Sequence, residues 1–367
     1  MKKLILASIL LGTVLASSFR VLAQANESDN ASDVVDGVTR SKVIDGVLNE
    51  IERAYVYPDV GEKMVDSVRT RVERHEYDSI LKASELADRL TRDLQEVSKD
   101  RHLRVDFHPE RPLISLNSAP DLESFHARQR RRNYGFEHAE RFPGNIGYLD
   151  MRTFEHTNSG GPTAVTAIAF LINTEALIID LRNNGGGHES MVQLLASYFL
   201  SPDPEDLYDS YWREENRTDQ NWSFPYVPGS RYGTKKSLYL LIGKHTFSAA
   251  ETLAYCLHNR KRAILVGETT GGGVNNGFPR TVYNEHFTIW IPFGTDIDPL
   301  TKTNWEGVGV KPDIEIPEAL ALNTAYLSAL KSVLESTSDE ELKQEIRDAM
   351  VTAKEELDAQ KHAEEKH

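Results

Sequence analysis

The chain has 367 residues, a formal net charge of -14 and one cysteine. A chain of this length can fold into one large domain or into two to three smaller ones with a substantial core. Its acidic charge disfavours nucleic acid or an anionic membrane as the main partner, because phosphate binding requires basic patches. The sequence has neither an H-E-x-x-H motif nor paired cysteines, so we expect no metal and no cofactor.

The N-terminal segment predicts export. Met1, Lys2 and Lys3 form a basic start, an apolar run follows at 4–15, and the small residues Ala23 and Ala25 offer cleavage sites. We expect a signal peptide over 1–25, a flexible leader over 26–36, and a periplasmic or secreted protein. The apolar run is short for a membrane span, so stable insertion is not expected, although an uncleaved signal would leave the chain associated with the membrane.

Helical periodicity dominates the next segment. Apolar residues recur at helical spacing at Val43, Val47, Ile51, Leu86, Leu90, Leu94 and Val97. This pattern predicts an N-terminal helical subdomain of about three helices over 37–98. Residues 106–141 mix prolines with a basic run over 128–132, which is typical of a solvated surface.

A buried strand over 176–182 ends in the sequence Asn183-Asn184-Gly185-Gly186-Gly187, and a helix is expected from about Glu189 to Leu200. Three glycines between a strand and a helix let the backbone approach a ligand and point N–H groups at it. The loop suits an oxyanion hole, with a plain glycine-rich turn as the alternative. Neither nucleotide-binding glycine motif is completed here.

Residues 202–231 are interpreted as a long loop rich in aromatic side chains. These are Tyr208, Tyr211, Trp212, Trp222, Phe224 and Tyr226. Aromatic loops beside a site often line a substrate groove. The alternative is that they plug the surface beneath the loop.

The strand over 237–242 leads through a turn to Ser248 at the start of a helix. A serine at this junction exposes its hydroxyl beside unpaired helix N–H groups, which favour developing negative charge. Ser248 is therefore a candidate nucleophile, with a plain helix N-cap as the alternative. Cys256, on the following helix, cannot pair within the chain and is interpreted as a small buried thiol.

A third strand at 263–267 runs into another glycine loop that ends at Gly273. The strand–helix–strand–helix–strand order over 176–273 predicts a largely parallel sheet. Ligands of such sheets bind beyond the carboxyl ends of the strands, so both glycine loops and Ser248 are expected around one pocket. Beyond residue 317 the chain is expected to form a helical, charged tail that is solvated or frayed.

The ordered motifs LIIDLRNNGGG, S-A-A-E and RAILVGETTGGG resemble the tail-specific, or C-terminal processing, serine peptidase family. The resemblance covers roughly residues 94–316. It implies an α/β fold with a ClpP/crotonase-like β/β/α spiral core, placed at 99–317, between the N-terminal helical subdomain and a C-terminal helical tail at 318–367. It also implies that Ser248 is the nucleophile.

Bacterial members of that family use a lysine base in the third glycine loop, where this chain has Gly273. The chain instead resembles the branch of tricorn protease and the interphotoreceptor retinoid-binding protein repeats, in which an upstream histidine is the base. His102 occupies the matching segment. His188 and His245 lie closer to the motifs, but triad members usually come from separate segments.

The same branch implies a glutamate partner for the histidine, for which Glu306 is the candidate; Asp296 and Asp298 are the alternatives. The oxyanion hole would use the backbone N–H groups of Gly186, Gly187 and Ala249. The expected function is an exported serine-type peptidase that hydrolyses unfolded proteins or peptides. A noncatalytic binding protein for an apolar ligand and an esterase remain alternatives, since both would use the same pocket.

Overall fold

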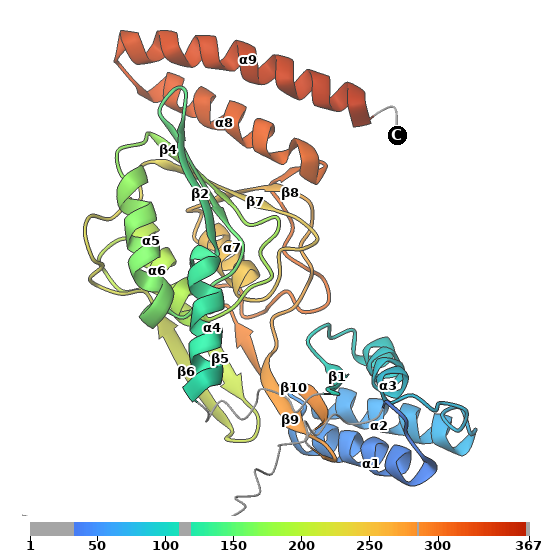
Figure 1. Ribbon diagram of the computed structural model, residues 1–367. Helices are drawn as coiled ribbons and strands as arrows, with labels where there is room; N and C mark the ends of the chain where they lie inside the picture. Colours follow the sequence, from blue (N-terminus) through green and yellow to red (C-terminus); the bar gives the residue numbers. More distant parts are fainter. Residues whose placement is uncertain (1–32, 110–118, 285, 365–367) are drawn as a thin grey trace, which may run out of the picture.

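The computed structural model describes residues 33–109, 119–284 and 286–364 (Figure 1). The predicted signal peptide lies outside these residues, as does most of the predicted leader. The described end of the leader is held in place, because the carboxylate of Asp33 accepts hydrogen bonds from the N–H and hydroxyl of Ser84 at 2.8 and 2.9 Å. Over the described residues, no helix combines the length and apolarity that membrane crossing requires.

Three helices open the fold, as predicted: α1 (Gly37–Ala54), α2 (Pro58–Glu73) and α3 (Ala83–Ser98). Asp36 caps α1 by accepting from the N–H of Thr39 at 2.7 Å, and Pro58 begins α2, where its missing N–H costs nothing. The buried apolar faces of the helices form one cluster with β1 (Arg104–Phe107) and β10 (Phe287–Ile297). The helices therefore pack onto a sheet that is completed from distant sequence.

The predicted parallel sheet is confirmed. Its strand order is β11-β8-β7-β4-β3-β2, and all pairs are parallel except β2 with β3. The strands are β2 (Phe136–Phe142), β3 (Ile146–Met151), β4 (Ala176–Asp180), β7 (Ser237–Ile242), β8 (Ile264–Gly267) and β11 (Ile314–Glu315). The inner strands are near-continuous apolar runs because both faces of the sheet are covered.

Helices cover the two faces of this sheet (Figure 1). One apolar cluster joins the sheet to α5 (Thr157–Leu171), α6 (Glu189–Phe199) and α7 (Ala249–Asn259). A second cluster joins the opposite face to α8 (Ala321–Ser336) and α9 (Glu340–Glu364). The α/β class with helical N- and C-terminal parts is as predicted. The exact subdomain boundaries at 98 and 317 stay predictions.

A second, antiparallel sheet was not predicted. It has the order β1-β10-β5-β6, with β9 (Asn276–Thr281) also paired to β10. Residues 202–231 are therefore not one long loop, since β5 (Asp206–Trp212) and β6 (Arg217–Trp222) form a hairpin. Charged residues hide the alternation of these strands, and β5 gains its second partner only from distant β10. Ahead of β2 lie α4 (Ala119–Arg131) and a short 3₁₀ turn at Asn133–Gly135.

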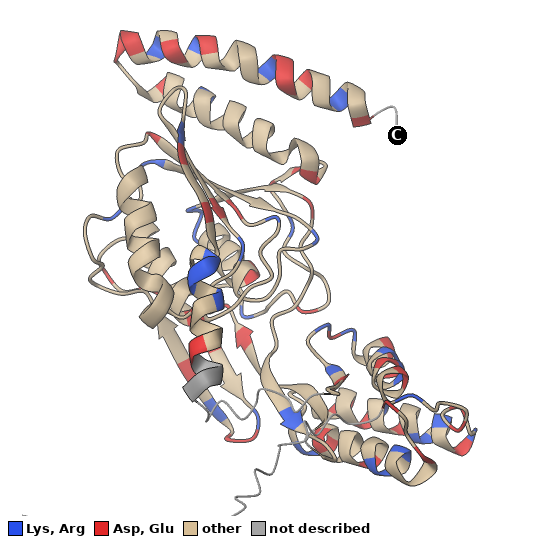
Figure 2. Ribbon diagram, in the orientation of Figure 1, with Lys and Arg blue, Asp and Glu red and all other residues tan. Residues whose placement is uncertain are grey.

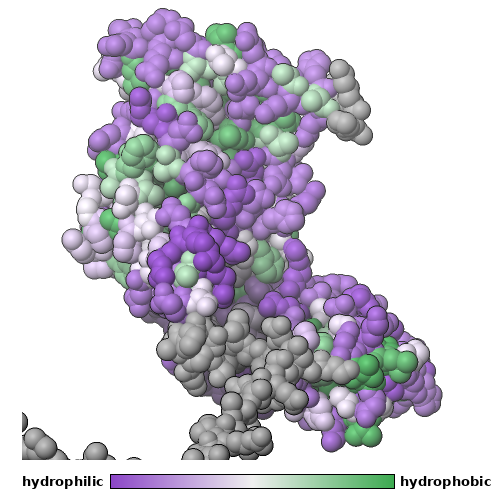
Figure 3. Space-filling view, viewed as in Figure 1, coloured by the Kyte–Doolittle hydropathy of each residue, from purple (hydrophilic) through white to green (hydrophobic). Residues whose placement is uncertain are grey.

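The C-terminal tail is helical, as predicted, but it is packed rather than frayed. Helix α9 buries a stripe formed by Ile346, Ala349, Ala353 and Leu357, while its other positions carry most of its charges (Figure 2). The face of the molecule seen in Figure 3 is mostly hydrophilic where α9 lies. A short 3₁₀ turn at Glu318–Leu320 leads into α8.

Candidate active site

Ser248 lies at a sharp turn between β7 and α7. It has φ +55° and ψ −127°, a backbone conformation that residues with side chains rarely adopt. Such a conformation costs on the order of 1–3 kcal/mol and is typical of residues that the surrounding structure holds for function. The turn leaves Ser248 half-buried at the N-terminus of α7. This is the strand–turn–helix geometry of an exposed nucleophile.

The buried carboxylate of Glu251 holds this turn. One oxygen accepts from the N–H groups of Ser248 and Gly273, each at 2.9 Å. The other accepts from the N–H of Gly272 at 2.8 Å and from the hydroxyl of Thr270. Burial raises the pKa of Glu251, and these four hydrogen bonds act in the opposite direction. One side chain thus fixes the serine turn and the third glycine loop together, a role that sequence analysis did not assign.

The first glycine loop lies against the serine. A Cβ atom on Gly186 would stand 2.7 Å from the Cβ of Ser248 and 3.0 Å from the backbone nitrogen of Ala249, so only glycine allows this approach. The buried side chain of Asn184 accepts from the N–H of Gly186 at 2.9 Å and donates to Met151 at 3.0 Å. Asn184 is a second positioning residue that the sequence motif did not reveal.

The three predicted oxyanion donors differ in availability. The N–H of Gly186 already donates to Asn184. Within the part of the chain that the structure describes, the N–H groups of Gly187 and Ala249 have no hydrogen-bond acceptor. Gly187 has φ +138° and lies in a bridge with Phe154. Gly187 and Ala249 are therefore the better pair of candidate donors.

His102 is half-buried beside the aromatic ring of Phe247, with ring centroids 4.5 Å apart. A Cβ on Gly273 would overlap the Phe247 ring and lie 2.9 Å from Cε1 of His102. The space around Gly273, where the resembling bacterial enzymes carry lysine, is thus filled by the imidazole and its neighbour. Burial, and secondarily Arg104 and Arg101, lower the pKa of His102 to about 4.

Two carboxyl groups lie beside His102. One side-chain nitrogen or oxygen atom from each of Asp100, His102 and Glu306 lies within 4.8 Å of the other two. Asp100 is fully buried and accepts from the N–H of His102, the hydroxyl of Tyr55 and the amide of Asn275 at 2.9, 3.1 and 2.8 Å. Among the described residues, these three side chains also place their nitrogen and oxygen atoms close enough together to ligate a metal ion.

Glu306 is oriented toward this group by the backbone. Its Oε2 accepts from the N–H groups of Val274 and Asn275 at 2.7 and 3.2 Å. Its Oε1 is buried and has no hydrogen-bond partner among the described residues, and the same holds for Nδ1 of His102. Burial, followed by the charge of Asp100, raises the pKa of Glu306 to about 8.

The other candidates have different surroundings. Asp296 accepts hydrogen bonds from the side chains of Ser210 and Asn276, each at 2.7 Å. Asp298 forms an ion pair with Arg260 at 3.4 Å. His188 caps α6 by accepting from Ser190 at 3.1 Å. His245 is exposed and does not line the cavity that contains Ser248. Asp296 and Asp298 thus lie outside the group that Asp100, His102 and Glu306 form, whereas His188 lines the same cavity as Ser248.

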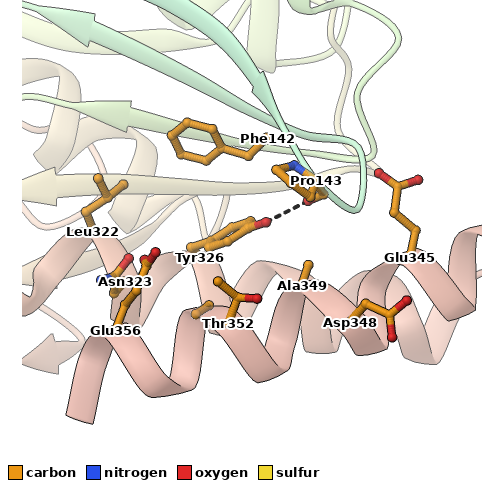
Figure 4. Close-up of a pocket in the computed structure, with 11 residues that line it drawn as sticks. Phe142, Pro143, Leu322, Asn323, Tyr326, Glu345, Asp348, Ala349, Thr352 and Glu356 are labelled. Carbon is orange, nitrogen blue, oxygen red and sulfur yellow. Dashed lines mark hydrogen bonds between the residues drawn. The ribbon is translucent and has the colours of Figure 1, made fainter. Parts of the chain in front are cut away.

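Ser248 and His102 line one cavity of about 510 Å³, together with Gly187 and His188. Asn275, Asn276 and Gly277 contribute polar backbone and side chains. Its aromatic lining consists of Trp212, Phe278, Trp290 and Phe293. A separate groove lies between the β2–β3 turn and helices α8 and α9, away from these residues (Figure 4). Ser248 and the first glycine loop meet at this cavity as predicted, whereas Gly273 does not line it and lies beside His102 instead.

A strained serine at a helix N-terminus, a nearby histidine–carboxylate group and two backbone N–H groups without an acceptor among the described residues are typical of the serine hydrolase class of site. Residues 145–316 match peptidase family S41, and residues 38–129 match the N-terminal domain of peptidase S41 in eukaryotic IRBP. The chain therefore belongs to peptidase family S41, a family of serine peptidases.

Curated relatives match parts of the chain. The chain is 31% identical over 99 residues to a tail-specific protease of Haemophilus influenzae. The matched segment covers 27% of this chain and 13% of that protein. It is 28% identical over 205 residues to carboxyl-terminal-processing peptidase 2, chloroplastic, of Arabidopsis thaliana. This match covers 51% of this chain and 35% of that protein. The chain thus spans less than half the length of the curated relatives it matches.

A solved structure supports the fold independently. A lipoprotein from Streptococcus agalactiae superposes with a TM-score of 0.54 at 16% sequence identity, over 80% of this chain and 96% of that chain. At this identity the similarity concerns the fold alone.

Proposed function

We propose that this protein is a serine-type peptidase that hydrolyses peptide bonds in unfolded proteins or peptides through Ser248, His102 and Glu306. The observation that carries the proposal is that Ser248 and His102, far apart in sequence, line the same cavity. The family membership and the names of the curated relatives, which are processing proteases, support the same reaction class.

In the proposed reaction, Ser248 attacks the substrate carbonyl while His102 takes the hydroxyl proton. The N–H groups of Gly187 and Ala249 donate to the oxyanion that develops. The proton then passes from His102 to the leaving amine, the peptide C–N bond breaks, and an ester remains on Ser248. Water, deprotonated by His102, hydrolyses that ester and regenerates the serine.

In this proposal Glu306 selects the tautomer of the base. If its Oε1 accepts a hydrogen bond from the N–H at Nδ1 of His102, the lone pair of Nε2 is left for the serine. Nδ1 of His102 lies 3.9 Å from Oδ1 of Asp100 and, like Oε1 of Glu306, has no hydrogen-bond partner among the described residues, so the bond to Glu306 requires a closer approach. Such hydrogen bonds are often long before substrate binds and tighten afterwards.

The test is digestion of an unfolded protein and a diverse peptide mixture, with products identified by mass spectrometry. Wild-type protein should give defined cuts that are absent with Ser248→Ala and with His102→Ala. His245→Ala is the matched control because His245 is exposed and outside the cavity, and it should cleave normally. A fluorophosphonate should label Ser248 in the wild type.

The absence of both cleavage and labelling in folded wild-type protein would contradict the proposal. Saturable binding of an apolar ligand under those conditions would instead indicate the noncatalytic binding function. Cleavage of small esters without any cleavage of peptides would indicate an esterase.

We further propose that the protein is exported through its N-terminal segment, based on the basic start and the apolar run at 4–15. Mass spectrometry of the N-terminus of the mature protein, in separated cell fractions, tests this. Cleavage after Ala23 or Ala25 in an exported fraction is expected. An intact Met1 on protein confined to the cytosol would contradict export.

A further inference from the structure

The cavity beside Ser248 has an aromatic wall that comes entirely from the antiparallel sheet. Trp212 ends β5, Phe278 lies on β9, and Trp290 and Phe293 lie on β10. None of these side chains takes part in the proposed chemistry. We call these four residues the aromatic wall.

Packing behind the wall fixes its position. The Phe293 ring lies 4.7 Å from Phe278 and 5.5 Å from Trp212, centroid to centroid. The guanidinium of Arg280 lies 4.8 Å from the Phe293 ring and 5.2 Å from the Phe278 ring, and it is itself held by an ion pair with Glu214. These contacts favour a preformed surface over a loose loop.

The wall is exposed only in part, since Phe293 is buried and Trp212 and Trp290 are half-buried. Phe278 is 53% exposed. A contiguous apolar surface inside a concave site is typical of ligand binding, because covering it removes apolar area from water. The exposed part of Phe278 thus offers contact area that the folded chain itself leaves unused.

The charges at the rim are already paired. Arg217 contacts Glu215 at 2.9 Å and Asp219 at 3.2 Å. Asp219 also accepts from the indole N–H of Trp212 at 3.0 Å. Arg217 is thus balanced by two carboxylates, and the remaining charged residue of the lining is Glu189. Among the described residues that line the cavity, Arg217 is the one Lys or Arg, and it is already paired.

We propose that the aromatic wall selects peptides that carry an aromatic or other bulky apolar side chain next to the cleaved bond. Phe278 and Trp290 are the specificity-determining residues. Stacking against fixed rings rewards such a side chain, while an acidic one would lose its hydration without gaining a partner. The inference rests on the proposed peptidase function and deepens it by naming the substrate class.

The test compares the cleavage sites of wild type, Phe278→Ala and Trp290→Phe in a diverse peptide mixture by mass spectrometry. Aromatic and bulky apolar residues should be enriched at one position flanking the cut in the wild type. With Phe278→Ala, kcat/KM for an aromatic peptide should fall by about tenfold or more relative to an alanine-bearing peptide. Trp290→Phe should keep apolar selection and change the ranking among aromatic residues.

Phe170→Ala is the matched control, since Phe170 is a 63% exposed phenylalanine on α5 that does not line this cavity. Fluorophosphonate labelling of Ser248 is measured in every variant and separates the two proposals. Labelling without any apolar enrichment, or with a preference unchanged in Phe278→Ala, overturns the aromatic-wall inference while the serine hydrolase site stands. If the fluorophosphonate does not label folded wild-type protein, that result would instead count against the proposed function.

Discussion

Replacing Glu306 with glutamine should separate the charge of this residue from its shape. The glutamine carbonyl can still accept from the N–H groups of Val274 and Asn275, which now bond to Oε2 at 2.7 and 3.2 Å. The amide group would then take the place of Oε1 and donate toward Nδ1 of His102. That hydrogen bond fixes the imidazole proton on Nε2, the nitrogen that must be free to act as base. We therefore expect Glu306→Gln to lower kcat by about 10⁴-fold, the size of a wrong-tautomer defect in a triad.

Stability should change in the opposite direction. Burial and Asp100 raise the pKa of Glu306 from 4.5 to about 8. A folded-state pKa above the unfolded value means that this carboxyl stabilises the fold below about pH 4.5 and that this contribution is lost as pH rises toward 8. Glutamine does not titrate. The variant should thus match the wild type near pH 5 and exceed its free energy of unfolding by a few kcal/mol at pH 9.

The assays are peptide hydrolysis and guanidinium unfolding of wild type and variant at pH 5 and pH 9. Glu268→Gln is the control, because Glu268 pairs with Lys244 at 3.0 Å and lies outside the cavity. Ionised Glu306 is also the form that orients the base, so wild-type activity should rise with an apparent pKa near 8. Activity of Glu306→Gln within tenfold of wild type, or lower stability than wild type at pH 9, would refute this reasoning.

Three further outcomes are expected. Glu251→Gln should lower the free energy of unfolding by about 2–4 kcal/mol and remove most of kcat, because its amide N–H₂ would face backbone N–H donors such as that of Ser248. Chemical denaturation measures the first effect and steady-state kinetics the second. Gly187→Ala should destabilise the fold and lower kcat, since its Cβ would overlap the carbonyl of Phe154; thermal unfolding and peptide hydrolysis check this. Gly273→Lys should not restore cleavage to His102→Ala in the same assay, because a Cβ at position 273 would still overlap the Phe247 ring; restored cleavage would disprove that.

The parallel sheet was predictable because its strands carry their own signal. Apolar runs over 176–182, 237–242 and 263–267 are mostly buried, and a helix lies between each run and the next. The antiparallel sheet was missed because its strands alternate weakly, and β10 joins partners that are far away in sequence. The hairpin β5–β6 was consequently interpreted as loop.

The supporting residues of the candidate site divide in the same way. Ser248 and the glycine loops stand in short motifs whose local geometry is written in neighbouring residues. Asn184 and Glu251 stand in these motifs, but their positioning roles, like that of Asp100, carry no local signal, because a buried polar residue looks like a surface residue until its partners are known. Their partners come from segments up to 175 residues away, as with Asp100 and Asn275.

The sequence by itself determined the class of sheet, the strand-to-helix turns and the position of the serine, because periodicity, glycine and helix capping act over a few residues. Only the tertiary structure placed His102 beside Asp100 and Glu306, filled the space at Gly273 with an imidazole and an aromatic ring, and brought the aromatic wall to the serine. These features depend on contacts between distant segments. Such contacts form when apolar faces are buried together, and no local pattern encodes them.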